Sequence, residues 1–237
     1  MSHHLALTRA WTQEGTALFA KALESLDDHM LAGPGTLPGW TGRHLVAHVA
    51  ANAEALGNLV HWARTGEETP MYSSPVQRTS DIEGGALRPA RELRDWFASS
   101  AARLADSLDE LTPPQWSREV LTAQGRTVPA TEIPWMRSRE VMVHAVDLGG
   151  AVGFDDLPAA FHAALLDDVA DRRSDAGDGP TIVVVPDDER RTWLVMGTGR
   201  PTAVRGPLAQ LTAYLTGRPA TGLHADGGAL PPLPRWL

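Results

Sequence analysis

Residues 132–148 form the most informative segment of the chain, because apolar side chains surround nearly the whole helix that the segment predicts. These apolar side chains are Val141, Met142, Val143 and Val146. A helix that is apolar on all sides lies inside a protein, and Gly149 follows where such a helix ends readily. Other elements of the fold must therefore cover this segment.

Three earlier segments carry apolar residues at helical spacing and predict further helices. They run from Leu5 to Met30, from the candidate N-cap Thr41 to about Gly66, and from Ala86 to Leu111. Together with residues 132–148 they predict an N-terminal helical bundle. The loop from Glu67 to Gly85 is rich in Pro, Ser and Thr and is too long to be a simple connection, so we expect it to cover a site.

The pattern of residue types along the sequence changes after Leu157. We expect a helix at Ala159–Arg173, strands at Thr181–Val185, Thr192–Met196 and Thr202–Val204, and a helix at Gly206–Thr216. These elements predict an α+β protein, in which residues 1–152 form the bundle and residues 153–237 form a small C-terminal α/β domain with a short sheet.

Composition excludes several classes of function. The chain has 21 Lys and Arg against 29 Asp and Glu, and its net charge of -8 opposes binding to nucleic acid. No apolar run approaches the ~20 residues that cross a bilayer, and the first ten residues do not resemble a signal peptide. We expect a cytoplasmic monomer without a membrane or nucleic-acid partner. With no cysteine, any metal must be held by His, Asp or Glu, and the protein has no cysteine nucleophile.

Four ionisable residues lie within the apolar helix. Arg137, Glu140, His144 and Asp147 fall within roughly 80° of one another on a helical wheel. Burying them costs several kcal/mol unless they are paired or bind a metal. Glu140 and His144 are four residues apart, so their side chains project to a common point.

A second helix can complete a metal site at that point. On the wheel of the segment that follows Thr41, His48 lies closer to the buried face than His44. His48, Glu140 and His144 would give the two-histidine, one-glutamate set of catalytic zinc sites. The pattern also allows a simpler interpretation, in which Glu140 pairs with Arg137 and His144 donates to a backbone carbonyl.

Several longer motifs resemble the mycothiol-dependent maleylpyruvate isomerase family. They are Gly39–Ala50, containing Trp-Thr-Gly-Arg-His-Leu-Val-Ala-His, and His61–Tyr72, Leu121–Ala130, Trp135–Gly149 and the terminal Pro-Arg-Trp-Leu. The resemblance implies a DinB-like four-helix bundle followed by an α/β domain. It also implies a zinc ion held by His48, Glu140 and His144, and an active-site arginine that matches Arg218.

The activity implied by the resemblance is conversion of maleylpyruvate to fumarylpyruvate in gentisate degradation, with mycothiol as the thiol cofactor. A thiolate that adds to the alkene allows rotation before it leaves. Arg218 would hold a substrate carboxylate. Three alternatives remain at this stage, namely a mycothiol S-transferase, a metal-dependent hydrolase, and a bundle with a structural metal.

Overall fold

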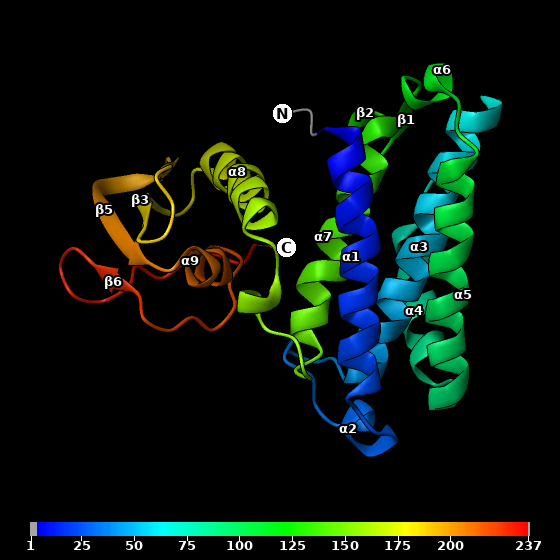
Figure 1. Ribbon diagram of the computed structural model, residues 1–237, viewed down its shortest axis with the longest axis horizontal. Coiled ribbons are helices and arrows are strands. Elements are labelled where there is room, and N and C mark those ends of the chain that lie inside the picture. Colours follow the sequence, from blue (N-terminus) through cyan, green and yellow to red (C-terminus); the bar gives the residue numbers. More distant parts are fainter. Residues whose placement is uncertain (1–3, 237) are drawn as a thin grey trace. The chain divides into compact units, whose positions relative to one another are not determined.

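A computed structural model describes residues 4–236, and these residues form two compact units (Figure 1). One unit ends at Val152 and the other begins at Gly153. The first is helical, and the second combines helices with a mixed sheet. The predicted α+β class, with a four-helix bundle and a short C-terminal sheet, is confirmed.

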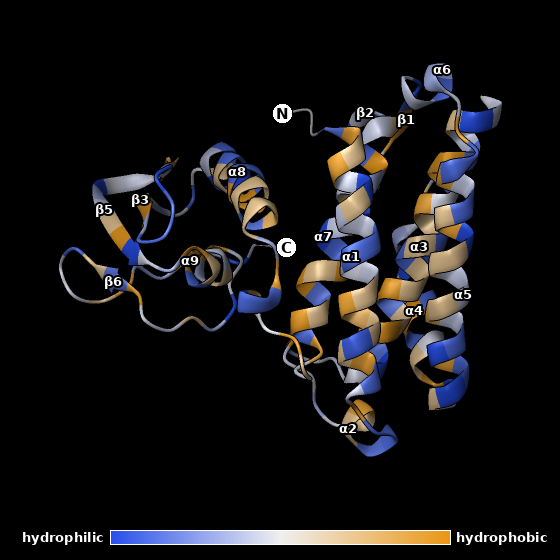
Figure 2. Cartoon of the chain, in the orientation of Figure 1, coloured by the Kyte–Doolittle hydropathy of each residue, from blue (hydrophilic) through white to orange (hydrophobic). Residues whose placement is uncertain are grey.

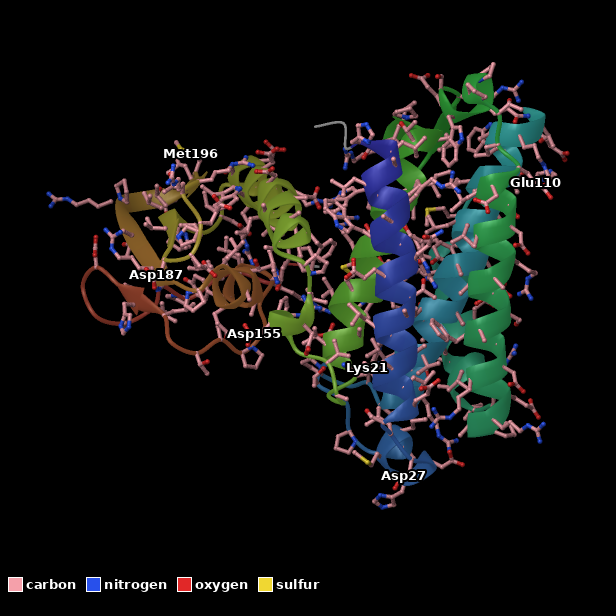
Figure 3. All side chains as sticks on the ribbon, viewed as in Figure 1. Lys21, Asp27, Glu110, Asp155, Asp187 and Met196 are labelled. Carbon is pink, nitrogen blue, oxygen red and sulfur yellow. The ribbon has the colours of Figure 1, made fainter. Side chains whose placement is uncertain are left out.

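The bundle consists of four long helices. They are α1 (Leu5–Glu24), α3 (Gly42–Thr65), α5 (Ala90–Asp109) and α7 (Ile133–Asp147). Helix α1 packs against α7, and α3 packs against both α5 and α7. Side chains fill the space between the helices (Figure 3), and apolar residues recur along their length (Figure 2). Helix α7 is largely buried, as was predicted for residues 132–148.

Short elements complete this unit. They are α2 (Asp28–Ala32), α4 (Pro75–Ala86), α6 (Pro113–Trp116), a hairpin of β1 (Glu119–Leu121) and β2 (Thr127–Pro129), and the 3-10 turn η1 (Ala130–Glu132). Helix α4 packs against α3.

Several predicted boundaries were wrong for local reasons. The first helix does not continue to Met30, because Asp27 accepts from the backbone N–H of Met30 and caps a separate helix, α2. The segment 67–85 is not all loop, since most of it forms α4. The third helix begins at Ala90, after Pro89, and ends at Asp109.

The C-terminal unit contains a four-stranded sheet of order β4-β3-β5-β6. Its elements are η2 (Phe154–Asp156), α8 (Ala159–Ala176), β3 (Pro180–Pro186), β4 (Trp193–Val195), β5 (Thr198–Gly206), α9 (Leu208–Leu215) and β6 (His224–Ala225). Strands β3 and β5 are parallel, with Val184 opposite Val204, and the two outer pairs are antiparallel. Strand β5 is thus longer than the predicted strand Thr202–Val204. It includes Gly206, which was predicted to begin the last helix.

None of the helices formed by residues 4–236 is long and apolar enough to cross a membrane.

Candidate metal centre

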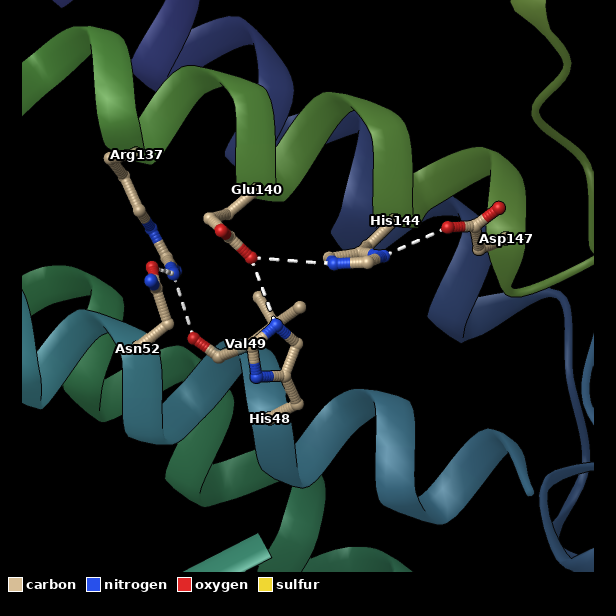
Figure 4. Close-up of polar contacts among 7 residues, drawn as sticks. All are labelled: His48, Val49, Asn52, Arg137, Glu140, His144 and Asp147. Atoms are coloured by element: carbon tan, nitrogen blue, oxygen red, sulfur yellow. Dashed lines mark hydrogen bonds and ion pairs between the residues drawn. The ribbon is translucent and has the colours of Figure 1, made fainter. Parts of the chain in front are cut away.

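Helices α3 and α7 bring His48, Glu140 and His144 to one point inside the bundle (Figure 4). Nε2 of His48 lies 2.9 Å from Oε2 of Glu140. Nε2 of His144 lies 3.3 Å from the same oxygen. One potential ligand atom from each residue lies within 4.8 Å of the other two. The three side chains that the sequence predicted as ligands therefore converge, as a shared cation requires.

This group is partly accessible. The His48 side chain is 8% exposed, whereas the side chains of His144 and Glu140 are 14% and 25% exposed. Within the described part of the chain, the group contains three candidate ligand residues and no fourth. A structural zinc site has four protein ligands, while a catalytic site has three and an open position. The ligand count favours the open type.

The protonation states of Glu140 and His48 suit metal binding. Burial opposes ionisation of Glu140, but hydrogen bonds from His144 and His48 outweigh it and hold the pKa of the carboxyl well below its usual range. Burial also lowers the pKa of His48, despite the nearby Glu140. Ionised carboxylate and neutral imidazole are the forms that coordinate metals.

Asp147 orients His144. Burial opposes the charge on His144, but hydrogen bonds with Asp147 and Glu140 raise its pKa to about 9. Nδ1 of His144 donates to Oδ2 of Asp147 at 2.9 Å, which leaves Nε2 towards Glu140. Asp147 is itself 2% exposed. A carboxylate behind a histidine fixes its ring orientation and raises its basicity as a ligand.

The simpler interpretation of the polar stripe does not describe these contacts. His144 Nδ1 donates to the Asp147 side chain instead of a backbone carbonyl. Arg137 is 1% exposed, and its Nη1 donates to the carbonyl of Val49 at 2.7 Å and to Oδ1 of Asn52 at 2.9 Å (Figure 4). Arg137 therefore ties α7 to α3 and helps to fix the separation of the two helices that carry the centre.

His44 lies outside the group because it caps its own helix. Its Nδ1 lies 2.7 Å from Oγ1 of Thr41, the N-cap of α3. Its Nε2 lies 3.3 Å from Glu83. The Trp40 ring stacks with His44 at 6.4 Å and meets the edge of His48 at 5.4 Å. Thr41 thus caps the start of α3 and also contacts the imidazole of His44, the other candidate ligand that the sequence offered on this helix.

Two residues of the segment between α3 and α5 lie near the centre. The charge of Arg78 is close enough to contribute to the low pKa of His48. Tyr72 lies beside Arg78, whose guanidinium carbon is 5.9 Å from the centroid of the tyrosine ring. The expectation that this segment covers a site is consistent with these positions. The sequence alone gave no reason to select Tyr72.

Arg218 belongs to the C-terminal unit, where it follows α9. Gly217 has a φ of +76°, which favours glycine, and the N–H of Arg218 donates to the carbonyl of Ala213 at 2.8 Å. This is a Schellman end to the helix. Nη1 of Arg218 donates to the carbonyl of Thr216 at 2.6 Å, and the guanidinium carbon lies 5.3 Å from the ring of Trp236. The side chain is therefore held in a defined position within its own unit.

Comparisons with known proteins find the same family in both halves of the chain. The model of the mycothiol maleylpyruvate isomerase N-terminal domain matches residues 12–149, and that of the MDMPI C-terminal domain matches residues 156–235. A crystal structure of the mycothiol-dependent maleylpyruvate isomerase is 39% identical, covers 99% of this chain and 98% of its own, and has a TM-score of 0.95. The structure of a histidine-to-alanine mutant of that isomerase has the same identity and coverage and a TM-score of 0.94.

A more distant structure shares the fold alone. It is YfiT from Bacillus subtilis, described as a "probable metal-dependent hydrolase with an unusual four-helix bundle topology". It is 20% identical, covers 61% of this chain and 85% of its own, and has a TM-score of 0.50. A comparison with curated proteins finds no match. The two family models and the 39% identical relative show that the chain belongs to the mycothiol-dependent maleylpyruvate isomerase family.

Proposed function

We propose that this chain is a cis-trans isomerase that converts maleylpyruvate to fumarylpyruvate with mycothiol, in the degradation of gentisate. The observation that carries the proposal is a partly accessible three-residue ligand set in a family member that is 39% identical to such an isomerase. The chain has no cysteine, so a thiol must come from a bound molecule. The need for a thiol nucleophile is therefore compatible with a chain that contains no cysteine.

We infer that the centre holds zinc through His48, Glu140 and His144. The residues fit this ion because they supply two imidazoles and one carboxylate, and because Asp147 leaves Nε2 of His144 directed towards the carboxylate. When bound, the metal supplies a Lewis acid that lowers the pKa of a thiol or polarises a carbonyl, and mycothiol supplies the nucleophile.

The chain's own residues prepare this reaction. Asp147 accepts a hydrogen bond from the ring of His144, and Arg137 of α7 donates to the carbonyl of Val49 on α3, so both contacts favour one arrangement of the ligand side chains. The buried walls exclude most water around His48, which strengthens every electrostatic interaction there. Such rigidity is what positioning two reactants at one point demands.

Arg218 is our candidate for the substrate carboxylate in the C-terminal unit. Its planar guanidinium can bind a carboxylate through two parallel hydrogen bonds, which fixes orientation as well as position. The Schellman turn and Trp236 hold the side chain before substrate binds, and this reduces the entropy lost on binding.

The decisive assay follows the loss of maleylpyruvate spectroscopically, with and without mycothiol, in metal-replete and metal-stripped protein. We expect turnover only when both are present, with the thiol recovered unchanged. Stoichiometric consumption of mycothiol would identify an S-transferase instead. Turnover without any thiol would identify a hydrolase and reject the proposal.

Replacement of single ligands tests the metal centre. We expect His48→Ala and His144→Ala to lose bound zinc and most turnover, because two ligands hold the ion poorly. His61→Ala is the matched control, since the His61 side chain is 41% exposed and lies outside the group. Metal analysis of the purified variants checks this, and one zinc per chain in both ligand variants would show that the ligands are wrongly assigned.

A further inference from the structure

Arg78 lies on α4, which packs against α3, and its charge is close enough to act on His48. Oγ of Ser74 accepts from the N–H of Gln77 at 3.0 Å, and Pro75 is the first helical residue, so the start of the helix is well defined. Ile82, one turn after Arg78 on the same side, is 3% exposed. The buried face of α4 therefore continues to Arg78 and directs it towards α3.

Gly85 shows how closely α4 packs. A Cβ atom at Gly85 would lie 2.6 Å from the ring of Trp96 and 2.8 Å from Cβ of Ala47. Ala47 precedes the candidate ligand His48 on α3. Because nothing larger than glycine fits between these elements, α4 lies directly against α3 and α5 at this point. Arg78 is thus carried by a helix that packs directly against the helix of His48.

Among the described residues, Arg78 has no carboxylate partner. Throughout residues 4–236, no Asp or Glu forms an ion pair with its guanidinium, whereas Arg9, Arg64 and Arg103 of the same bundle each pair with an acid. Arg78 is half-buried beside the half-buried Tyr72. A partly desolvated guanidinium with an available donor face is suited to an anionic ligand.

We propose that Arg78 binds a carboxylate of the substrate at the metal centre, with the Tyr72 hydroxyl as a second donor. This inference rests on the proposed function. Maleylpyruvate carries carboxylates, whereas mycothiol has none, so Arg78 discriminates between the two reactants. It positions the alkene relative to the metal-binding residues and is a substrate-binding residue additional to Arg218.

Kinetics separate this role from a structural one. We expect Arg78→Gln to raise KM for maleylpyruvate about 10- to 100-fold, the effect of losing hydrogen bonds to a charged group. We expect Arg78→Lys to raise KM for maleylpyruvate less than Arg78→Gln does, because lysine keeps the positive charge but cannot form two parallel hydrogen bonds. KM for mycothiol and zinc content stay unchanged. Arg91→Gln, at an exposed arginine on α5, is the control.

Binding without turnover tests the same site independently. Maleate is titrated calorimetrically into the zinc-loaded full chain without thiol, and we expect binding to the wild type and to Arg91→Gln, weaker binding to Tyr72→Phe, and a loss in Arg78→Gln. Equal maleate affinity in the wild type and Arg78→Gln overturns the proposal, as does a rise in KM confined to mycothiol. If the wild type does not isomerise maleylpyruvate yet maleate binding depends on Arg78, the proposed function fails while the anion site stands.

Discussion

Asp147 provides the most direct test of how the proposed metal centre is built. It is 2% exposed, and its Oδ2 accepts from Nδ1 of His144 at 2.9 Å. In Asp147→Asn, the amide oxygen can still accept this hydrogen bond, but the negative charge behind the ring is lost. In Asp147→Ala, the acceptor is lost as well. The two variants therefore separate charge from orientation.

The size of the effect follows from this geometry. Loss of a partner behind a metal-bound histidine weakens metal affinity by about 10- to 100-fold. Each tenfold step corresponds to about 1.4 kcal/mol. We place Asp147→Asn near the lower end, because it keeps an acceptor for His144. Asp147→Ala belongs near the upper end, because Nδ1 of the histidine loses this acceptor and the ring is free to rotate.

Competition with a chromophoric zinc chelator measures these affinities. Asp109→Asn is the control, since the Asp109 side chain is 63% exposed, pairs with Arg9 at the surface and lies outside the group of candidate ligands. Such a surface pair contributes about 0–1 kcal/mol to stability. Wild-type zinc affinity in both Asp147 variants would refute the argument that this carboxylate supports His144.

Three further changes have defined outcomes. Arg218→Lys should retain zinc and lose most activity, because an ammonium cannot bind a carboxylate through two parallel hydrogen bonds; wild-type kcat/KM would make Arg218 a structural residue. Gly15→Ala should lower the free energy of unfolding by about 1–2 kcal/mol, because a Cβ there would lie 2.5 Å from Cγ2 of Val141 and overpacking outweighs the gain in helix propensity. Gly57→Ala, where no atom of residues 4–236 would lie within 4 Å of the added Cβ, should instead raise the free energy of unfolding by about 0.5–1 kcal/mol. Chemical denaturation compares the two variants, and changes of the same sign would contradict the packing argument. His162 is 2% exposed, and burial lowers its pKa from 6.5, so its imidazole stays neutral in the folded protein but gains a proton in the unfolded chain. The free energy of unfolding should therefore fall as the pH drops below 6.5, and it should fall less in His162→Gln. Urea titrations at several pH values measure this difference.

Local periodicity explains why much of the bundle could be predicted. A helix places residues at fixed angles, so the stripe of Glu140, His144 and Asp147 on α7 follows from spacing alone. The same rule favoured His48 over His44. The capping contact of His44 with Thr41 supplies a physical reason for that choice, because it engages the ring at the start of α3.

Helix α4 was missed because its signals are weak. The segment is rich in Pro, Ser and Thr and offers one large buried apolar residue, Ile82. Ser74 and Pro75 are nevertheless an N-cap and a first-turn proline, which predict a helix start when read together. The hairpin at residues 119–129 was missed for a similar reason, since strands of three residues carry little pattern.

The sequence by itself determined that residues 132–148 form a buried helix, that this helix carries two ligand-type side chains on one face, and that no cysteine takes part. These properties depend on covalent order and helical geometry, which are local. Only the tertiary structure decided that His48 of α3 meets that face and that Arg78 of α4 lies beside it. Such encounters depend on how side chains pack between distant segments, as at Gly85 between Ala47 and Trp96, and no spacing along the chain encodes them.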